Sequence, residues 1–429
     1  MSKKDFLVEV GTEELPPRSL DVLADAFARG VAQGLDDAGL SYRAIETFAT
    51  PRRLAVRARQ LPERQPDRKV ERRGPPVKAA FDADGAPMRA ALAFASSCGV
   101  EVSELDRMET SKGTWLLFRG TESGADTVDR LPPLVESALD SLPIAKRMRW
   151  GSSETEFVRP VHWLVMLFGR DVVPCTLLGI DASNVTYGHR FMAPRGFKVT
   201  SPAAYLNTLR RRGRVLADPI ERREMIRAGS AELGERNGGK TVIAEDLLGE
   251  VTALVEWPVP LIGRFDEGFL ELPEEVLIAT LQDHQRYFPV RDADGALLPC
   301  FVTVSNIESK EPEKVIAGNE RVVRPRLADA AFFWKTDRQR TLASRNEALR
   351  RVTYQSKLGT LHDKAERVGG LAVGLAPVIG GDAQLAGRAA ELAKCDLLTQ
   401  MVGEFPELQG IMGYYYAVHD SEPQEVAVA

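Results

Sequence analysis

The sequence predicts an α+β protein with more than one domain, in which an α/β body is followed by an all-α region. Its 429 residues exceed the roughly 150 of a typical single domain. Strand and helix patterns alternate in the N-terminal part, whereas after Arg321 only a helical period continues towards the C-terminus. We therefore place the main boundary near 320–326 and predict two domains, 1–325 and 326–429.

The chain opens with a predicted strand, helix and strand. Residues 6–10 read as a strand, and apolar residues at three- and four-residue spacing between Leu20 and Leu35 predict a helix of about twenty residues that stops at Gly39. Leu54, Val56 and Ala58 then alternate with other residues, as in a half-buried strand.

The rest of the N-terminal body has a less regular pattern. Residues 60–80 are rich in Pro, Arg and Lys and predict a loop or arm. A second α/β stretch begins near Phe81, with helices expected at 132–142 and 220–233 and a strand at 158–169. Strands at 287–290 and 297–305 flank the sequence DADG at 292–295, which predicts a hairpin.

Composition indicates a reducing, cytoplasmic environment. The four cysteines are scattered without a C-x-x-C pair, and the N-terminus lacks the apolar stretch of a secretion signal. The longest apolar run, 161–169, is about half of what a membrane span needs, so no membrane partner is expected.

Net charge alone argues against nucleic acid as a binding partner, but the distribution of charge along the chain reverses that conclusion. Lys and Arg total 56 against 61 acidic residues, a net charge of −5. Residues 52–73 hold nine basic and three acidic residues, 210–227 seven and three, and 319–351 nine and four, whereas 352–429 hold five and ten. Each cluster is equally consistent with a solvated face; together they predict a surface that binds a polyanion.

Several short motifs suggest chemistry that their context does not support. The segment GERNGGKT at 234–241 matches a P-loop, but it follows a charged amphipathic helix instead of a buried strand, so it reads as a helix C-cap. His162 lies in an apolar run and is expected in the core. The doublets at 283–284 and 362–363 are interpreted as chance adjacency, and we predict no catalytic residue and no metal ligand.

Two stretches combine cations with aromatic rings, as RNA-binding surfaces do. IAKRMRWG at 144–151 brings three basic residues to Trp150, and YGHRF at 187–191 brings together Tyr187, Arg190 and Phe191. A helix cap or packed corner is the equally weighted alternative for any one of these residues.

Nine segments in order resemble the β subunit of bacterial glycyl-tRNA synthetase. They cover nearly the whole chain: FLVEVGTEELP at 6–16, TPRRL at 50–54, KRMRWG at 146–151, FVRPVHW at 157–163, GHRF at 188–191, DHQRYF at 283–288, PRLADAAFF at 325–333, KLGTLHDK at 357–364 and EFPELQG at 404–410. The resemblance implies an α2β2 ligase in which the α subunit binds ATP, glycine and Mg²⁺, while the β subunit positions tRNA(Gly) and holds no cofactor.

The resemblance also implies specific modules. The N-terminal body would contain a B3/B4-like module and the C-terminal region an HD-like domain, and we expect the chain to be an N-terminal fragment without the anticodon-binding region. Cys395 and Asp396 would take the place of the HD doublet, so a degenerate, metal-free domain is expected. Two alternatives remain open: an HD-type metal-dependent phosphohydrolase using Asp396, and an editing hydrolase module using His189 or His284.

The predicted tRNA-binding residues are drawn from these basic and aromatic segments. They are Arg52, Arg53, Arg72, Arg73, Lys146, Arg147, Arg149, Trp150, Arg190, Arg210, Arg211 and Arg212.

Overall fold

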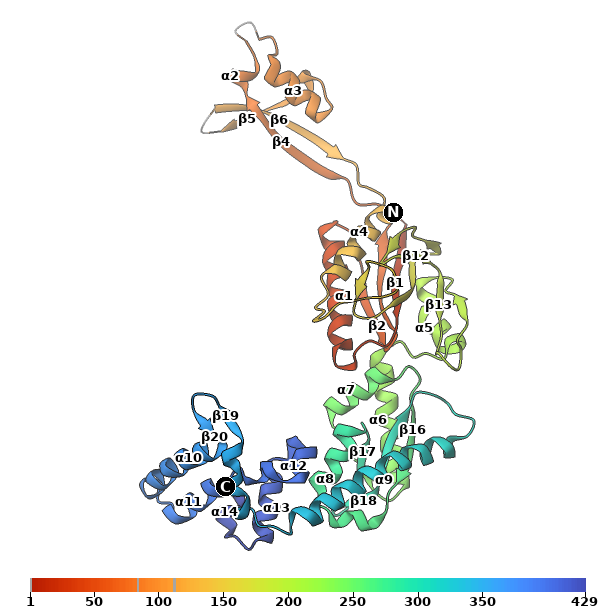
Figure 1. Cartoon of the computed structure of the whole chain (residues 1–429). Helices are drawn as coiled ribbons and strands as arrows, with labels where there is room; N and C mark the ends of the chain where they lie inside the picture. The colour runs from red at the N-terminus through yellow and green to blue at the C-terminus, as the bar shows by residue number, and fades with distance from the viewer. Residues whose placement is uncertain (1, 83–84, 111–112) are drawn as a thin grey trace. The chain divides into compact units, whose positions relative to one another are not determined.

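The computed structural model describes residues 2–82, 85–110 and 113–429 (Figure 1). The chain divides into two compact units. One unit extends to Asp218 and the other runs from Pro219 to Ala429. Both contain helices and strands, and the C-terminal part of the second is mainly helical. Among the helices of the described ranges, none has the length and apolar content needed to cross a membrane.

A seven-stranded sheet forms the centre of the first unit. Its strands are β1 (Lys3–Thr12), β2 (Ala44–Thr50), β3 (Arg53–Pro62), β9 (Val161–Phe168), β10 (Asp171–Val172), β11 (Thr176–Leu177) and β12 (Ile180–Ser183). β1 lies in the middle and pairs antiparallel with both β3 and β9. Because both faces of a central strand are covered, the run FLVEV is apolar throughout except for Glu9.

Helices cover one side of this sheet and a smaller β-containing layer covers the other. Helix α1 (Pro17–Asp37) has its predicted apolar face buried and packs on α4 (Thr127–Asp140). α4 begins ahead of the predicted start at Pro132, because its buried face already includes Thr127 and Leu131. The other layer consists of β13 (Val185–Tyr187), β14 (Gly196–Lys198), α5 (Tyr205–Thr208) and the turn η3 (Leu209–Gly213).

The segment 60–80 is not the loop that the sequence predicts, although its exposed residues agree with the expectation that it lies outside the main core. It contains β4 (Arg68–Pro76) and α2 (Val77–Ala80), and β4 pairs with β6 (Gly113–Glu122), which also pairs with β5 (Asp106–Thr110). With α3 (Arg89–Cys98), these elements enclose a small core of Ala80, Ala91 and Leu116. The partner strand of β4 lies far along the chain. The charged side chains of β4 are exposed, and for this reason the local sequence shows no apolar alternation. A separate pair of short strands follows, β7 (Met148–Arg149) and β8 (Glu156–Phe157).

The second unit begins with a four-stranded sheet and flanking helices. Its strands are β15 (Lys240–Thr241), β16 (Val259–Arg264), β17 (Phe288–Arg291) and β18 (Leu297–Ser305), and its helices are α6 (Pro219–Arg236), α7 (Glu245–Leu254) and α8 (Glu274–Ala279), the last followed by the turn η5 (Thr280–His284). The predicted hairpin is confirmed: β17 and β18 pair around a turn in which the Asp292 side chain accepts two backbone N–H groups and Gly295 has φ +87°.

The remaining elements are mostly helices and short helical turns. They are α9 (Pro312–Asp337), η6 (Ala343–Arg351), α10 (Leu361–Leu375), η7 (Ala376–Ile379), α11 (Ala383–Leu392), η8 (Cys395–Leu398), α12 (Gln400–Glu404), η9 (Pro406–Leu408), α13 (Ile411–His419) and α14 (Gln424–Val428), with a small hairpin of β19 (Thr353–Gln355) and β20 (Gly359–Thr360).

The predicted boundary at 320–326 falls inside α9 instead of in a linker. Val323 and Leu327 of this helix pack in one core with Phe301 of β18 and with Met401 and Met412 of the later helices. The change from strand to helix patterns therefore marks a change of local structure within one compact unit, and the structure divides at Asp218.

Buried Asp337 organises part of this helical region. Its carboxylate accepts the backbone N–H groups of Gln400 and Met401 at 2.9 and 3.0 Å and the Tyr416 hydroxyl at 3.1 Å, with Arg345 at 3.5 Å. Burial, followed by the Asp337 charge, raises the pKa of Tyr416. A carboxylate at the start of α12 satisfies N–H groups that have no partner within the helix.

A buried carboxylate also lies at the centre of the first unit. Glu9 of β1 is fully buried and accepts hydrogen bonds from Trp163 Nε1, the Thr186 hydroxyl and the Tyr205 hydroxyl. The guanidinium of Arg53, also fully buried, lies 3.5 Å from it. Burial and the nearby Glu9 charge raise the pKa of Tyr205, so its hydroxyl remains a donor. One side chain thus joins β1, β3, β9, β13 and α5.

Replacing Glu9 by Gln should strongly destabilise the first unit. The substitution leaves the Arg53 guanidinium buried without its counter-charge, a loss of about 3–5 kcal/mol for such pairs. The matched control is Glu154→Gln, since the Glu154 side chain is 89% exposed and pairs with Arg149 at the surface; less than about 1 kcal/mol is expected there. Urea denaturation followed by circular dichroism measures both, and equal stability of the two variants would contradict the assigned role.

Candidate nucleic-acid interface

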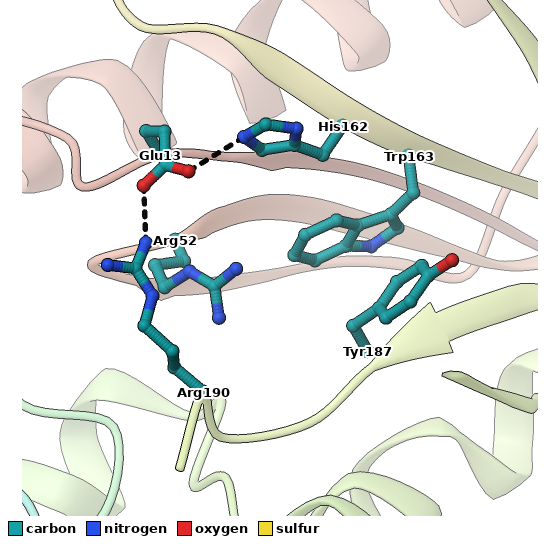
Figure 2. Close-up of a pocket in the computed structure, with 6 residues that line it drawn as sticks. All are labelled: Glu13, Arg52, His162, Trp163, Tyr187 and Arg190. Atoms are coloured by element: carbon teal, nitrogen blue, oxygen red, sulfur yellow. Dashed lines mark hydrogen bonds and ion pairs between the residues drawn. The ribbon is translucent and has the colours of Figure 1, made fainter. Parts of the chain in front are cut away.

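A pocket of about 440 Å³ opens beside the central sheet of the first unit (Figure 2). Its lining comes from segments that the sheet brings together: the residues after β1, the β2–β3 turn, the start of β9 and the end of β13. The six lining residues are Glu13, Arg52, His162, Trp163, Tyr187 and Arg190.

Trp163 and Tyr187 form the aromatic side of the pocket. Their ring centroids lie 5.1 Å apart with the planes inclined by 51°. Trp163 is 4% exposed, and its ring lies directly over Gly11, where an added Cβ would come within 1.8 Å of it. Tyr187 is 38% exposed, so its ring is available to a ligand. The guanidinium of Arg52 lies 5.6 Å from the Trp163 ring centroid.

Glu13 organises the polar side. Its carboxylate is 2.8 Å from His162 Nε2 and accepts a hydrogen bond from Arg190, which also pairs with Glu14 at 3.1 Å. Partial burial opposes ionisation, but the hydrogen bonds from Arg190 and His162 outweigh it and lower the pKa of Glu13. The carboxylate is therefore charged at neutral pH, and the pocket presents both an acceptor and guanidinium donors (Figure 2).

The prediction that His162 lies in the core is wrong. Its side chain is 46% exposed, whereas Val161 and Trp163 on either side are buried. His162 lies near the start of β9, where its side chain contacts Glu13 and lines the pocket together with Trp163. The sequence hid its exposure because the residues on either side of it are apolar and buried.

The predicted tRNA-binding residues lie in different environments. Arg52 and Arg190 line the pocket, but Arg53 is fully buried and donates to the backbone oxygen of Tyr187 at 2.9 Å. An arginine without exposed surface cannot contact a phosphate, so we remove Arg53 from the candidate surface and assign it a positioning role.

The other predicted residues are at least partly accessible. Arg72 and Arg73 lie on β4, with the Arg73 guanidinium 4.2 Å from the Trp115 ring centroid. Lys146 is exposed, while Arg147 and Arg149 bond to the Asp140 carbonyl and the Glu154 carboxylate; Trp150 is half-buried. Arg210, Arg211 and Arg212 project from η3 and are exposed. These residues lie on three separate segments of the first unit, and only Arg52 and Arg190 share the pocket described above.

Part of the basic character in the sequence is used internally. Arg222 is buried and donates to the Thr252 carbonyl. Arg227 and Arg223 both pair with Glu245. The hydrogen bond from Arg227 is the main cause that lowers the pKa of Glu245 to about 2. In the cluster at 319–351, Arg345 pairs with buried Asp337. The clusters at 210–227 and 319–351 therefore expose less positive charge than their composition suggests.

The P-loop-like segment is a helix end, as predicted. α6 ends at Arg236, and backbone N–H groups of residues 237–239 bond back to carbonyls of its last turn. Gly238 has φ +79°, the left-handed conformation common at such ends.

The histidines named for editing have structural partners. His189 is buried, and its Nδ1 accepts the backbone N–H groups of Phe191 and Met192 at 3.3 and 3.2 Å. His284 stacks on Phe405 with ring centroids 4.9 Å apart. The geometry of each is that of a turn or packing contact, and neither is among the residues that line the pocket at Glu13.

Cys395 and Asp396, the expected counterpart of the HD doublet, are both buried. Asp396 accepts the backbone N–H of Gly410, and burial raises the pKa of the Cys395 thiol to about 11. A protonated thiol is a poor metal ligand. Among the described residues, the one group spaced to hold a metal is His362, Asp363 and Glu366, in which Asp363 already serves as the capping carboxylate of α10.

Cys395 should be nearly inert to alkylation in the folded protein. With a pKa of about 11, only about one thiol in a thousand is ionised at pH 8, and the thiolate is the reactive form. Iodoacetamide followed by peptide mass spectrometry should show labelling of half-buried Cys98 well before Cys395, with Cys395 labelled only after denaturation. Equal labelling rates in the native protein would contradict the buried, protonated state.

Sequence reasoning missed Glu9, Glu13 and Trp163 as parts of the site. Glu9 carried a visible signal, since an acid inside an apolar strand must find partners when both faces are buried. Glu13 and Trp163 carried none, because their roles depend on Arg190 and Gly11, which approach them only in the folded sheet.

Comparison with known proteins identifies the family. The family model for the glycyl-tRNA synthetase beta subunit matches residues 6–429. The chain is 55% identical over 430 residues to the glycine–tRNA ligase beta subunit of Marinobacter nauticus and 54% identical over 429 residues to that of Hahella chejuensis, covering 100% of this chain and 62% of each relative. A Pseudomonas aeruginosa beta subunit is 55% identical with the same coverage.

The chain therefore spans about 62% of the length of the curated relatives it matches. Since the family model covers it from residue 6 to its last residue, the chain belongs to the glycyl-tRNA synthetase beta subunit family.

Proposed function

We propose that this chain is the tRNA-handling part of a glycine–tRNA ligase, positioning tRNA(Gly) for glycylation by a separate alpha subunit. The observation that carries the proposal is the family match over residues 6–429. In this proposal the alpha subunit binds ATP, glycine and Mg²⁺, and the assembly is α2β2. We also propose that the first unit includes a B3/B4-like module and that the helical region is HD-like.

The accessible basic residues are the proposed tRNA contacts. Phosphate contacts require cations that are exposed and can exchange counterions for RNA. The candidate set without buried Arg53 is at least partly accessible, with Arg52 and Arg147 half-buried: Arg52, Arg72, Arg73, Lys146, Arg147, Arg149, Arg190, Arg210, Arg211 and Arg212, with Trp150 as a half-buried aromatic.

Charge reversal at Arg149 and Arg211 should weaken tRNA(Gly) binding and flatten its dependence on salt. Each lost phosphate contact lowers the slope of log affinity against log salt by about one. Arg236→Glu is the matched control, because Arg236 is equally a surface arginine, 70% exposed, but lies outside the candidate set. Filter binding over a salt series measures the effect; an unchanged slope in the Arg149→Glu and Arg211→Glu variants would remove these residues from the interface.

The alpha subunit is the proposed protein partner. Mixing this chain with a glycine–tRNA ligase alpha subunit should shift both to an earlier position in size-exclusion chromatography, with a mass from light scattering that fits an α2β2 assembly. The alpha subunit alone is the control. Independent elution of the two chains would contradict docking through this part of the β chain.

A further inference from the structure

The geometry of the pocket at Glu13 points to a specific kind of ligand. We propose that it holds one unpaired nucleotide of a bound RNA, with the base against Tyr187 and the polar edge of the base facing Glu13 and Arg190. This inference rests on the proposed function, because the RNA in question would be the bound tRNA.

The aromatic side of the pocket fits a planar ligand. The Tyr187 ring is 38% exposed and inclined to the buried Trp163 ring, so a flat group can lie on the tyrosine. Unstacked RNA bases bind proteins in this way, on aromatic rings and guanidinium planes. A volume of about 440 Å³ is within the range of small-molecule sites.

The polar side fits a ligand with both donors and acceptors. Glu13 places a carboxylate, and Arg190 and Arg52 place guanidinium groups, on the lining of one opening. Arg52 and Arg190 contribute positive charge to this lining, and Glu13 contributes negative charge. A base presents N–H donors and carbonyl or ring-nitrogen acceptors, and the phosphate of the same nucleotide can pair with a guanidinium.

The pocket is built before any ligand arrives. Glu9 fixes the indole N–H of Trp163, and Arg53 holds the Tyr187 carbonyl at 2.9 Å. Gly11 allows the indole to lie flat against β1, since any Cβ there would overlap the ring. Binding therefore requires little ordering of the pocket walls. Less binding free energy is lost, which matters most for a small ligand such as a single nucleotide.

Ligand-detected NMR can test the site directly. The probes are AMP, CMP, GMP and UMP, with ribose 5-phosphate as the control that has the phosphate but no base. Saturation transfer to base protons is expected for at least one nucleotide, with ribose 5-phosphate bound at least about tenfold more weakly. No transfer to any of the four at millimolar concentration, or equal binding of ribose 5-phosphate, would overturn the proposal.

Variants identify the ring that carries the binding. Tyr187→Ala should weaken nucleotide binding about tenfold or more, and Tyr187→Phe should retain it within about twofold because the ring remains. Tyr354→Ala is the matched control: Tyr354 is 43% exposed with Lys364 4.2 Å from its ring centroid, but it belongs to the second unit and should leave binding unchanged. Equal affinity in Tyr187→Ala and Tyr354→Ala would also overturn the proposal.

Filter binding of tRNA(Gly) separates the two levels of inference. Normal tRNA binding by the unmodified chain without nucleotide binding would reject the pocket and leave the proposed function standing. Nucleotide binding that depends on Tyr187, without any tRNA binding, would support the pocket as a nucleotide site and count against the tRNA-handling role.

Discussion

The buried contact between Glu9 and Arg53 is the interaction on which the first unit depends. Two opposite charges without exposed surface are stable only when every remaining polar atom has a partner. Trp163, Thr186 and Tyr205 donate to Glu9, and Arg53 donates onward to the Tyr187 carbonyl. The same bonds that satisfy the charges therefore hold the Trp163 ring and the backbone at Tyr187 beside the pocket, so stability and site geometry have a common origin.

The second unit uses a related arrangement for a different purpose. Asp337 is buried with Arg345 and accepts the first N–H groups of α12, which fixes α9 against the later helices. None of the residues that line the pocket at Glu13 takes part in this network. Buried carboxylates thus organise both units, and in the first unit the network also supports a candidate binding site.

Charge in this protein has to be judged by where it is exposed. The net charge of −5 argues against a nucleic-acid partner, and the clusters in the sequence argue for one. The structure shows that Arg53 and Arg222 are buried and that Arg227 is paired with Glu245, whereas Arg210, Arg211 and Arg212 are exposed. Counting arginines along the chain overstates the accessible charge, because a buried or paired guanidinium has already exchanged its solvent for protein partners.

By itself the sequence determined the elements whose signals are local: the apolar face of α1, the turn at Gly238 that follows the end of α6, and the hairpin of β17 and β18. The motif series also indicated the family. Only the tertiary structure decided that β4 pairs with β6, that α9 continues through the predicted boundary, and that Glu13, His162 and Arg190 meet. Each of these depends on contacts between residues far apart in the chain, and such contacts leave no periodic pattern in the sequence around either partner.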